Sequence, residues 1–469
     1  MRYGHLDTES LPAWAVLNDI QLPAARVTRN ILDSDGNSKG GGLVATRDVS
    51  AGAILLKVPS ELIVSRGQVD QCAKVDCTLR TILDAAESFA KTPRLLILVF
   101  LLYQMTMGSP DNEHRTGAKQ SPHADYVKFL PKSIPLPTFY TEAERALLSG
   151  TSLKDALEQK LTSLEKEFDQ LREETSTVPW CRDTWWDEQN GILTMDDWKL
   201  ADAEYRSRAL ELPRGVGDSM VPVVDMANHA SDNRSNARFE VDDDGNAVLV
   251  VRDDKSIASG EEITIMYGVG GATEMVFSYG FLEEGASSAR EMFLNLSMPE
   301  DDPLRIAKIR YAEEAPGVRI FVNHAGKVDW DSNYVWWACI NEEDGLDFRV
   351  AQTNDGQKEL KASWKGHEFA AGELKDILMN DQLRDIFVLR ATVLIQQRLE
   401  EQGLALAGTE QAFLEARDQS DSSESVWKLV SRLRDLELEL VSDGFQHLET
   451  EVSGPVRIVS EFSCKGCLG

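Results

Sequence analysis

Hydrophobic and polar positions change their period several times along the chain. Residues 36–65, GNSKGGGLVATRDVSAGAILLKVPSELIVS, alternate glycine-rich turns with short β-favouring runs, which predicts small strands joined by tight loops. From about Val69 the pattern becomes helical, and in residues 151–174 apolar positions recur at spacings of three and four. The most apolar run, residues 95–103, is shorter than the roughly 20 residues that span a bilayer, so we predict a buried helix there.

Strand-like patterns return after Gly217. Residues 236–241 and 247–253 flank the sequence DDDGN, whose Asp-Gly and Gly-Asn steps accept the positive φ of a tight turn, and the stretch therefore predicts a hairpin. A third strand is predicted in EITIMYG, residues 262–268. Beyond Glu283, long amphipathic stretches predict a largely helical ending.

The order of these patterns predicts an α+β chain, in which a helical insert separates two β-rich parts and a mostly α-helical domain follows. We place these parts at residues 14–68, 69–200, 201–284 and 285–469. A length of 469 residues is comfortable for two or three domains with large cores.

Composition and charge narrow the class of protein. Hydrophobic residues make up 42% and charged residues 27% of the chain, as in ordinary soluble globular proteins. The 78 acidic residues outnumber the 49 Lys and Arg, which gives a formal charge of −29. Because phosphate contacts need clustered cations, this balance disfavours nucleic-acid binding, and a basic protein partner fits better.

Cysteine usage and the start of the chain predict an intracellular protein. Six cysteines in 469 residues do not form a disulfide framework, which favours a reduced compartment. The opening MRYGHLDTESLPAWA lacks the basic region and apolar run of a secretory signal. Cys464 and Cys467 form one isolated pair, which is either a zinc or redox site or part of a solvated tail.

Three stretches are candidates for chemistry, and each is ambiguous alone. The glycines at 40–42 either bring backbone N–H groups close to a ligand or form a flexible turn, and they do not make the G-x-G-x-x-G pattern of a dinucleotide fold. The run VVDMANHA holds Asp225, Asn228 and His229; it is either a ligand site or a buried, hydrogen-bonded histidine, and seven histidines in all offer few further metal ligands. The strand in SGEEITIMYG ends near Tyr267.

Taken together and in this order, GGGLVATRDVSAGAILLKVP, VVDMANHA, GEEITIMYG and FSYGFLEE resemble the SET-domain methyltransferases, in the branch typified by the Rubisco large-subunit lysine methyltransferase. The specific motifs cover about Trp14 to Glu284, and beyond them only the helical character matches. That branch divides a β-rich, pseudoknotted SET domain with a helical insert and appends a helical substrate-binding domain. Fungal members are most similar, so we expect a cytoplasmic and/or nuclear protein.

The resemblance implies that S-adenosyl-L-methionine is the cofactor and that no metal is used. In the family the asparagine-histidine pair holds the cofactor through main-chain and side-chain hydrogen bonds, the glycine loop contacts its methionine end, and an aromatic residue covers its adenine. At Lys39 the family often has an acidic or other polar residue, so this chain departs from the pattern there. The implied cofactor-binding residues are Lys39, Gly41, Leu43, Asn228, His229, Tyr267 and Phe281.

The resemblance also implies a lysine channel. Tyr267 corresponds to the catalytic tyrosine and Tyr279 to a second tyrosine of the channel, while RSRAL, residues 206–210, resembles the end of the insert. Methyl transfer from a sulfonium is an in-line displacement that needs a neutral amine and aligned dipoles, which suits these residue types. Arg208 and Asp225 either line this pocket or form a purely structural ion pair. The implied substrate-binding residues are Ser207, Arg208, Leu210 and Asp225.

The acceptor is predicted to be a lysine of a non-histone protein, with ribosomal proteins and translation factors favoured. The branch also contains an actin-histidine methyltransferase, but it carries asparagine and tryptophan where this chain has Leu210 and Val224, and an apolar sleeve suits lysine better than imidazole. Protein-histidine methylation and a non-catalytic SET-fold scaffold are the alternatives. No nucleic acid and no membrane are expected as partners.

Overall fold

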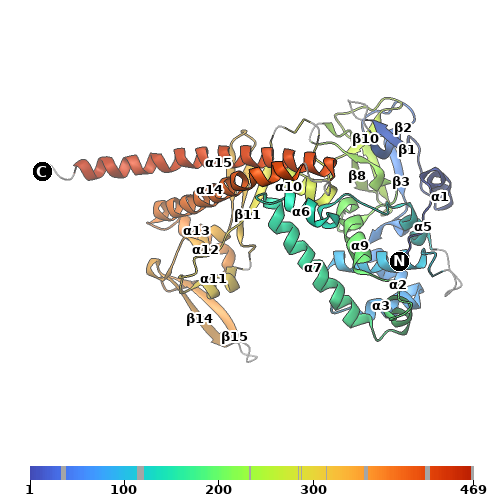
Figure 1. Cartoon of the computed structure of the whole chain (residues 1–469), viewed down its shortest axis with the longest axis horizontal. Helices are drawn as coiled ribbons and strands as arrows, with labels where there is room; N and C mark the ends of the chain where they lie inside the picture. The colour runs from blue at the N-terminus through green and yellow to red at the C-terminus, as the bar shows by residue number, and fades with distance from the viewer. Residues whose placement is uncertain are drawn as a thin grey trace. The chain divides into compact units, whose positions relative to one another are not determined.

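The chain forms two compact units, which are described separately (Figure 1). The computed structural model describes residues 1–32, 38–112, 121–231, 234–283, 285–286, 288–312, 314–352, 358–417 and 423–465, with the backbone alone at 38–39 and 450–465. Unit 1 comprises Met1–Phe139, Leu157–Val269 and Phe277–Glu283, and unit 2 comprises Tyr140–Ala156, Gly270–Val276 and Glu284–Gly469.

Helix α4, Pro93–Met107, packs against several other helices of unit 1. The Thr92 hydroxyl caps its first turn by accepting from the Leu95 N–H, and proline suits a first helical position. Residues 96–106 are all buried, which confirms the predicted buried helix. The other helices with residues in unit 1 are α1 (Leu11–Leu17), α2 (Arg66–Val75), α3 (Cys77–Ala85), α5 (Pro122–Phe129), α7 (Ser152–Thr175), α8 (Pro179–Cys181) and α9 (Met195–Arg208).

Ten strands of unit 1 form three small sheets, in the orders β1-β2-β10-β7, β3-β9-β8 and β4-β6-β5. The predicted hairpin is confirmed, because β8 and β9 pair antiparallel around a turn in which Gly245 has a φ of +85°. The strands are β1 (Ala25–Leu32), β2 (Ser38–Ala45), β3 (Ile54–Val58), β4 (Val64–Ser65), β5 (Leu210–Leu212), β6 (Gly217–Met220), β7 (Asn228–His229), β8 (Ala237–Val241), β9 (Ala247–Val251) and β10 (Glu262–Ile265).

One hydrophobic core joins the two β-rich parts to the helices of unit 1. It includes Leu43 of β2, Ile97 of α4, Trp198 of α9 and Ile263 of β10, all of them fully buried. Residues more than two hundred positions apart therefore share one apolar interior, which holds β2 and β10 in place for the site described below.

Unit 2 combines helices with two three-stranded sheets, β11-β12-β13 and β14-β15-β16. In Figure 1 its two long helices, α14 and α15, run side by side. The sequence predicted a largely helical ending and missed the six short strands described here, in one of which, β14, buried and exposed positions alternate only weakly. Its elements are α6 (Glu142–Leu147), α10 (Ala272–Glu274), β11 (Glu291–Asn295), α11 (Arg305–Ala312), β12 (Gly317–Val322), β13 (Val328–Asp331), α12 (Tyr334–Ala338), β14 (Leu346–Gln352), β15 (Lys358–Trp364), β16 (His367–Phe369), α13 (Leu374–Met379), α14 (Arg384–Ala416) and α15 (Glu424–Lys465).

Mixed α and β structure, with small sheets, a helical insert and C-terminal helices, is the fold class expected from the sequence. In the part of the chain that the structure describes, no helix is both long enough and apolar enough to cross a membrane.

Candidate active site

A four-stranded sheet brings together the three stretches singled out in the sequence. Strand β10 lies between the glycine-rich β2, to which it is antiparallel, and the short β7, to which it is parallel. The parallel register pairs Thr264 with Asn228 and therefore sets the asparagine-histidine pair beside the end of β10. Tyr267 follows that end by two residues, so the tyrosine and the pair share one edge of the sheet.

The approach of β2 to Asn228 requires glycine. The Asn228 Nδ2 donates to the Gly41 carbonyl oxygen at 3.2 Å and to the Glu262 Oε1 at 2.8 Å. A Cβ built on Gly42 would lie 2.8 Å from that same Nδ2 and 2.8 Å from Cγ1 of Ile31. Because real Cβ contacts are longer than this, a side chain at position 42 would displace Asn228 or its neighbour.

His229 is held by the strand end that carries Tyr267. The Tyr267 backbone N–H donates to Nδ1 of the imidazole at 3.1 Å, which leaves the proton of the neutral ring on Nε2. The imidazole lies 5.2 Å from the Tyr267 ring and 6.2 Å from the Phe281 ring, measured between centroids. Phe281 is 36% exposed, which is high for an aromatic side chain among other rings.

The two tyrosines lie against each other. Their ring centroids are 4.8 Å apart, and the Tyr279 hydroxyl donates to the Tyr267 carbonyl oxygen at 3.4 Å. The Tyr267 hydroxyl donates to the carbonyl oxygen of Ala227 at 2.8 Å. Burial raises the pKa of Tyr267, so its phenol stays neutral at physiological pH.

A narrow cavity of about 10 Å³ opens beside the tyrosines. It is lined by residues from the end of α9, from β5, from the segment before β7, from the end of β10 and just beyond it, and from the segment Met275–Tyr279. These lining residues are Ser207, Arg208, Ala209, Leu210, Asp225, Ile265, Tyr267 and Tyr279. All four residues predicted to bind substrate therefore line one cavity with both predicted catalytic tyrosines.

Arg208, which lines this cavity, is held in place by two buried carboxylates. Its Nε donates to Glu204 Oε2 at 2.9 Å, and its Nη1 lies 3.5 Å from the Asp225 carboxylate and donates to the Asp225 carbonyl oxygen at 3.1 Å. The buried Tyr126 of α5 donates its hydroxyl to Asp225 Oδ2 at 2.6 Å. The pairing expected for Arg208 and Asp225 is present, and it extends into a four-residue buried network.

The network contains two carboxylates and one guanidinium, so it would carry a net negative charge if both carboxylates were ionised. Burial raises the pKa of Glu204 to about 7, although Arg208 opposes the shift. Burial also raises the pKa of Asp225, against the stabilising effects of Arg208 and Tyr126. We infer that Glu204 takes up a proton more readily than an ordinary glutamate and relieves the excess negative charge.

The remaining residues predicted to bind the cofactor, Gly41, Leu43 and Lys39, all lie in β2. Gly41 lies in β2 beside Asn228, whereas the Leu43 side chain is fully buried in the core, so Leu43 can reach a ligand only through its backbone. Lys39 lies in β2, and its side chain falls outside what the structure describes.

Two members of the network, Glu204 and Tyr126, were not found from the sequence. Glu204 precedes Arg208 by four residues on α9, a spacing that places two helical side chains side by side and was a usable signal. Tyr126 lies 99 residues from Asp225 in the chain, and no local pattern connects the two.

Comparison with known proteins places this geometry in a family. A family model described as "SET domain" matches residues 40–268. SET domain-containing protein 8 of Schizosaccharomyces pombe is 28% identical over 366 residues, which cover 76% of this chain and 79% of that protein. The chloroplastic Rubisco large-subunit N-methyltransferase of Nicotiana tabacum is 25% identical over 296 residues, which cover 59% of this chain and about half, 52%, of that enzyme.

A solved structure extends the likeness of the fold to nearly the whole chain. The SET domain of Rubisco LSMT, solved with methyllysine and AdoHcy, matches with a TM-score of 0.64 and 19% identity, covering 95% of this chain and 92% of that one. Residues 40–268 of this chain thus match the SET domain, and the chain is similar to methyltransferases of the branch that includes the Rubisco large-subunit enzyme.

Within the described ranges, no cluster of three or more His, Cys, Asp or Glu side chains is arranged to hold a metal ion. The pair Cys464 and Cys467 falls outside the side chains described.

Proposed function

We propose that this protein is an S-adenosylmethionine-dependent protein-lysine N-methyltransferase that acts on a non-histone protein. The observation that carries the proposal is the meeting of two features at the end of β10: the Asn228–His229 pair and the cavity lined by Tyr267 and Tyr279. The pair suits a cofactor, and the side chains that line the cavity suit a lysine, although the cavity of about 10 Å³ would have to widen to admit one. Tyr267 takes part in both features, because its backbone N–H donates to His229 and its side chain lines the cavity.

The residues present fit S-adenosylmethionine. The exposed Phe281 ring beside His229 offers a face on which adenine can stack. Gly41, Asn228 and His229 would hold the cofactor with polar groups. When bound, it supplies an electrophilic methyl group on a sulfonium.

The residues of the chain would align the amine and exclude water. Tyr267 acts as a neutral dipole, because burial keeps its phenol protonated and the Ala227 carbonyl oxygen orients its hydroxyl. The narrow cavity favours loss of the lysine proton, since burial lowers the pKa of an amine. The two tyrosine rings then attract the methylated ammonium by cation–π interaction.

The apolar character of positions 210 and 224 favours a lysine acceptor over a histidine. Leu210, which lines it, is 6% exposed and Val224, next to Asp225, is 1% exposed, and both are apolar. An imidazole acceptor would need a polar partner to fix its tautomer, and neither side chain offers one. These two positions support lysine over histidine as the acceptor.

For the substrate we propose a basic, lysine-presenting protein of the cytoplasm and/or nucleus, with ribosomal proteins and translation factors favoured. The support is the formal charge of −29, which attracts basic proteins.

Transfer of labelled methyl groups into a cell lysate of the source organism tests the proposal against the scaffold alternative. We expect a small number of labelled proteins on a gel, all of them absent when the variant Asn228→Ala replaces the natural protein. A lysate from a deletion strain ensures that the acceptor site is not already occupied. Cofactor binding by the natural protein with no labelled band in that lysate would contradict the proposal and favour a scaffold.

A further inference from the structure

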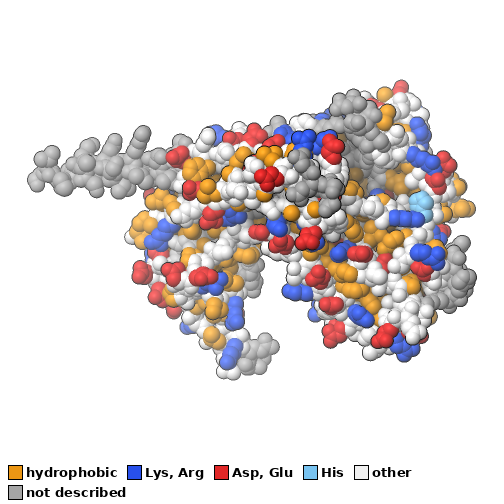
Figure 2. Space-filling model, in the orientation of Figure 1, with side chains coloured by type: hydrophobic (Ala, Val, Ile, Leu, Met, Phe, Trp, Pro, Cys, Tyr) orange, Lys and Arg blue, Asp and Glu red, His pale blue; other side chains and the backbone are white. Residues whose placement is uncertain are grey.

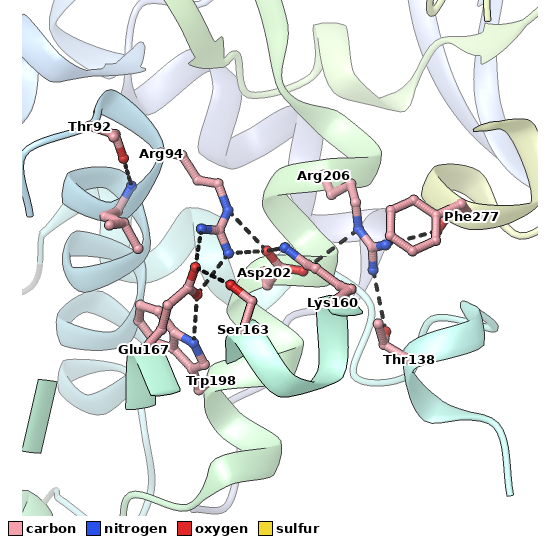
Figure 3. A network of polar contacts seen from close by, with 11 residues as sticks. Thr92, Arg94, Thr138, Lys160, Ser163, Glu167, Trp198, Asp202, Arg206 and Phe277 are labelled. Carbon is pink, nitrogen blue, oxygen red and sulfur yellow. Dashed lines mark hydrogen bonds and ion pairs between the residues drawn. The ribbon is translucent and has the colours of Figure 1, made fainter. Parts of the chain in front are cut away.

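A buried cluster of charged side chains joins three helices of unit 1 (Figure 3). We call it the Asp202 cluster, and its members are Arg94 of α4, Lys160 and Glu167 of α7, and Asp202 and Arg206 of α9. The Asp202 side chain is 1% exposed. Its Oδ1 accepts from Arg94 Nη2 at 2.6 Å and from Lys160 Nζ at 2.7 Å, while Arg206 Nε lies 3.6 Å from its Oδ2.

Arg206 differs from the other cations of the Asp202 cluster because it also contacts residues outside the cluster. Its Nη1 donates to the carbonyl oxygen of Phe277 at 3.0 Å, and its guanidinium carbon lies 4.4 Å from the centre of the Phe277 ring. Its Nη2 donates to the Thr138 hydroxyl at 3.3 Å. Figure 3 shows the guanidinium beside the Phe277 ring, with Asp202 on one side and Thr138 on the other.

Phe277 belongs to the one-turn π-helical segment Met275–Tyr279, which ends at the second channel tyrosine. Arg206 holds Phe277 by two contacts, a hydrogen bond to its backbone carbonyl and a cation–π contact with its ring. Phe277 lies two residues before Tyr279 in the chain. On its own helix Arg206 directly precedes Ser207 and Arg208, which line the same cavity as Tyr279. One side chain thus connects two segments that both contribute to the lining.

We propose that Arg206 is a positioning residue that sets the Tyr279 ring against the lysine channel, and that Asp202 orients Arg206 for this task. The inference rests on the lysine channel proposed above. The planar guanidinium of an arginine can pair with Asp202, donate to the Phe277 carbonyl oxygen and stack on the Phe277 ring at the same time. The ammonium group of a lysine, on its flexible stem, cannot make all three contacts at once. Small displacements of a channel wall carry large effects on methyl transfer, because the reaction depends on alignment.

Two variants separate this role from general stability. Arg206→Lys keeps the positive charge near Asp202 and loses the contacts to Phe277. Arg94→Lys is the matched control, since Arg94 shares Asp202 but contacts Glu167 in place of Phe277. Phe277→Leu removes the ring and keeps the backbone carbonyl, and it serves as a second variant if Arg206→Lys does not fold.

The readout is the NMR signal of free Nε-methyllysine carrying a ¹³C-methyl group, added to the full-length protein loaded with S-adenosylhomocysteine. In the natural protein the tyrosine rings should shift this signal upfield on binding. We expect Arg206→Lys, and Phe277→Leu in the same direction, to reduce the shift and weaken methyllysine binding about 5- to 10-fold, with unchanged affinity for S-adenosylhomocysteine. Arg94→Lys should lower the melting temperature and leave the shift unchanged.

The possible failures are distinguishable. An Arg206→Lys variant with the natural shift and affinity would overturn the positioning role, as would equal changes in Arg206→Lys and Arg94→Lys. No methyllysine binding by the natural protein would overturn the lysine channel itself, and the inference would fall with it.

Discussion

Tyr267 takes part in both features of the candidate site, the asparagine-histidine pair and the cavity lined by the two tyrosines. Its backbone N–H donates to His229, its hydroxyl donates to the Ala227 carbonyl oxygen, and its side chain lines the cavity. These contacts separate its two roles, since the backbone contact survives when the hydroxyl is removed. A phenylalanine at this position therefore tests the hydroxyl alone.

We predict that Tyr267→Phe lowers kcat by about 100-fold while the Kd for S-adenosylmethionine changes less than about 3-fold, because an oriented dipole near the reacting atoms is worth more in the transition state than in binding. Label transfer and calorimetric titration measure the two quantities. Equal losses in kcat and cofactor affinity would mean that the hydroxyl has only a structural role.

Glu204 gives the site a dependence on pH. Because its pKa in the folded protein, about 7, lies above the ordinary value of 4.5, its stabilising contribution is full below pH 4.5 and is lost as the pH rises through 7. Between pH 5 and pH 8 the free energy of unfolding of the natural protein should fall, relative to Glu204→Gln, by on the order of 3 kcal/mol.

Denaturant unfolding at a series of pH values measures this difference, with the exposed Glu211→Gln as the matched control. The control curve should run parallel to that of the natural protein. If the Glu204→Gln curve also runs parallel to it, Glu204 does not take up a proton in this range.

At the residue scale, whether a site residue could be predicted from the sequence depended on how far it lies along the chain from its partners. Asn228 and His229 are adjacent and form a recognisable motif, and Tyr267 ends a predicted strand, so the sequence pointed to all three. The buried partners of Arg208 differ in this respect. Glu204 was within reach of a helical spacing argument, whereas Tyr126 meets Asp225 only through the packing of α5.

At the scale of elements, the long periodic helices and the hairpin of unit 1 were predicted well, and the short strands of unit 2 were not. The helices α4 and α7 follow from an apolar run and from a three-and-four spacing, and both are present. The strands of unit 2 have seven residues or fewer, and in β14 buried and exposed positions alternate only weakly. Their pairing depends on partners elsewhere in the unit, which a local pattern does not reveal.

The first turn of α7 depends on a buried glutamate of α15. Glu437 is fully buried; its Oε2 accepts from the Ser152 backbone N–H at 3.0 Å, and its Oε1 accepts from the hydroxyls of Ser152 at 2.6 Å and Thr273 at 3.0 Å. Three donors would lose their acceptor in Glu437→Ala. We predict a destabilisation of at least roughly 1–3 kcal/mol from these unsatisfied groups.

Thermal unfolding of Glu437→Ala and of Glu439→Ala measures this contribution, because Glu439 is exposed on the same helix. Only the first variant should show a lower melting temperature. Similar melting temperatures for both variants would mean that the donors find other acceptors.

For the whole molecule, charge is the property that bears most on the substrate. Figure 2 shows acidic and basic side chains interspersed over the visible face, and the acidic ones do not gather in one patch there. A diffuse field of this kind acts over about one Debye length, roughly 10 Å at 0.1 M salt.

We predict that added salt raises the KM for the labelled protein substrate several-fold and leaves kcat unchanged, because screening weakens the attraction of a basic partner and does not reach the buried channel. The measurement is label transfer at increasing NaCl, with the Kd of S-adenosylhomocysteine as the control. A KM that does not depend on salt would contradict a basic substrate.

The order of β-rich and helical parts along the whole chain could be predicted because each part has its own periodicity. The boundaries at 68, 200 and 284 stay a prediction. The two compact units divide the chain differently, since Tyr140–Ala156 and Gly270–Val276 belong with the C-terminal unit. The assignment of these two segments to the C-terminal unit depends on packing between distant parts of the chain, which local sequence patterns do not reveal.

The most direct test of the central claim is the identity of the amino acid that receives the methyl group. Proteins labelled by the natural protein, but not by Asn228→Ala, would be hydrolysed and their methylated amino acids separated. The account predicts that the label is recovered as Nε-methylated lysine. Recovery as methylhistidine would contradict the assignment of the Leu210-lined cavity to lysine.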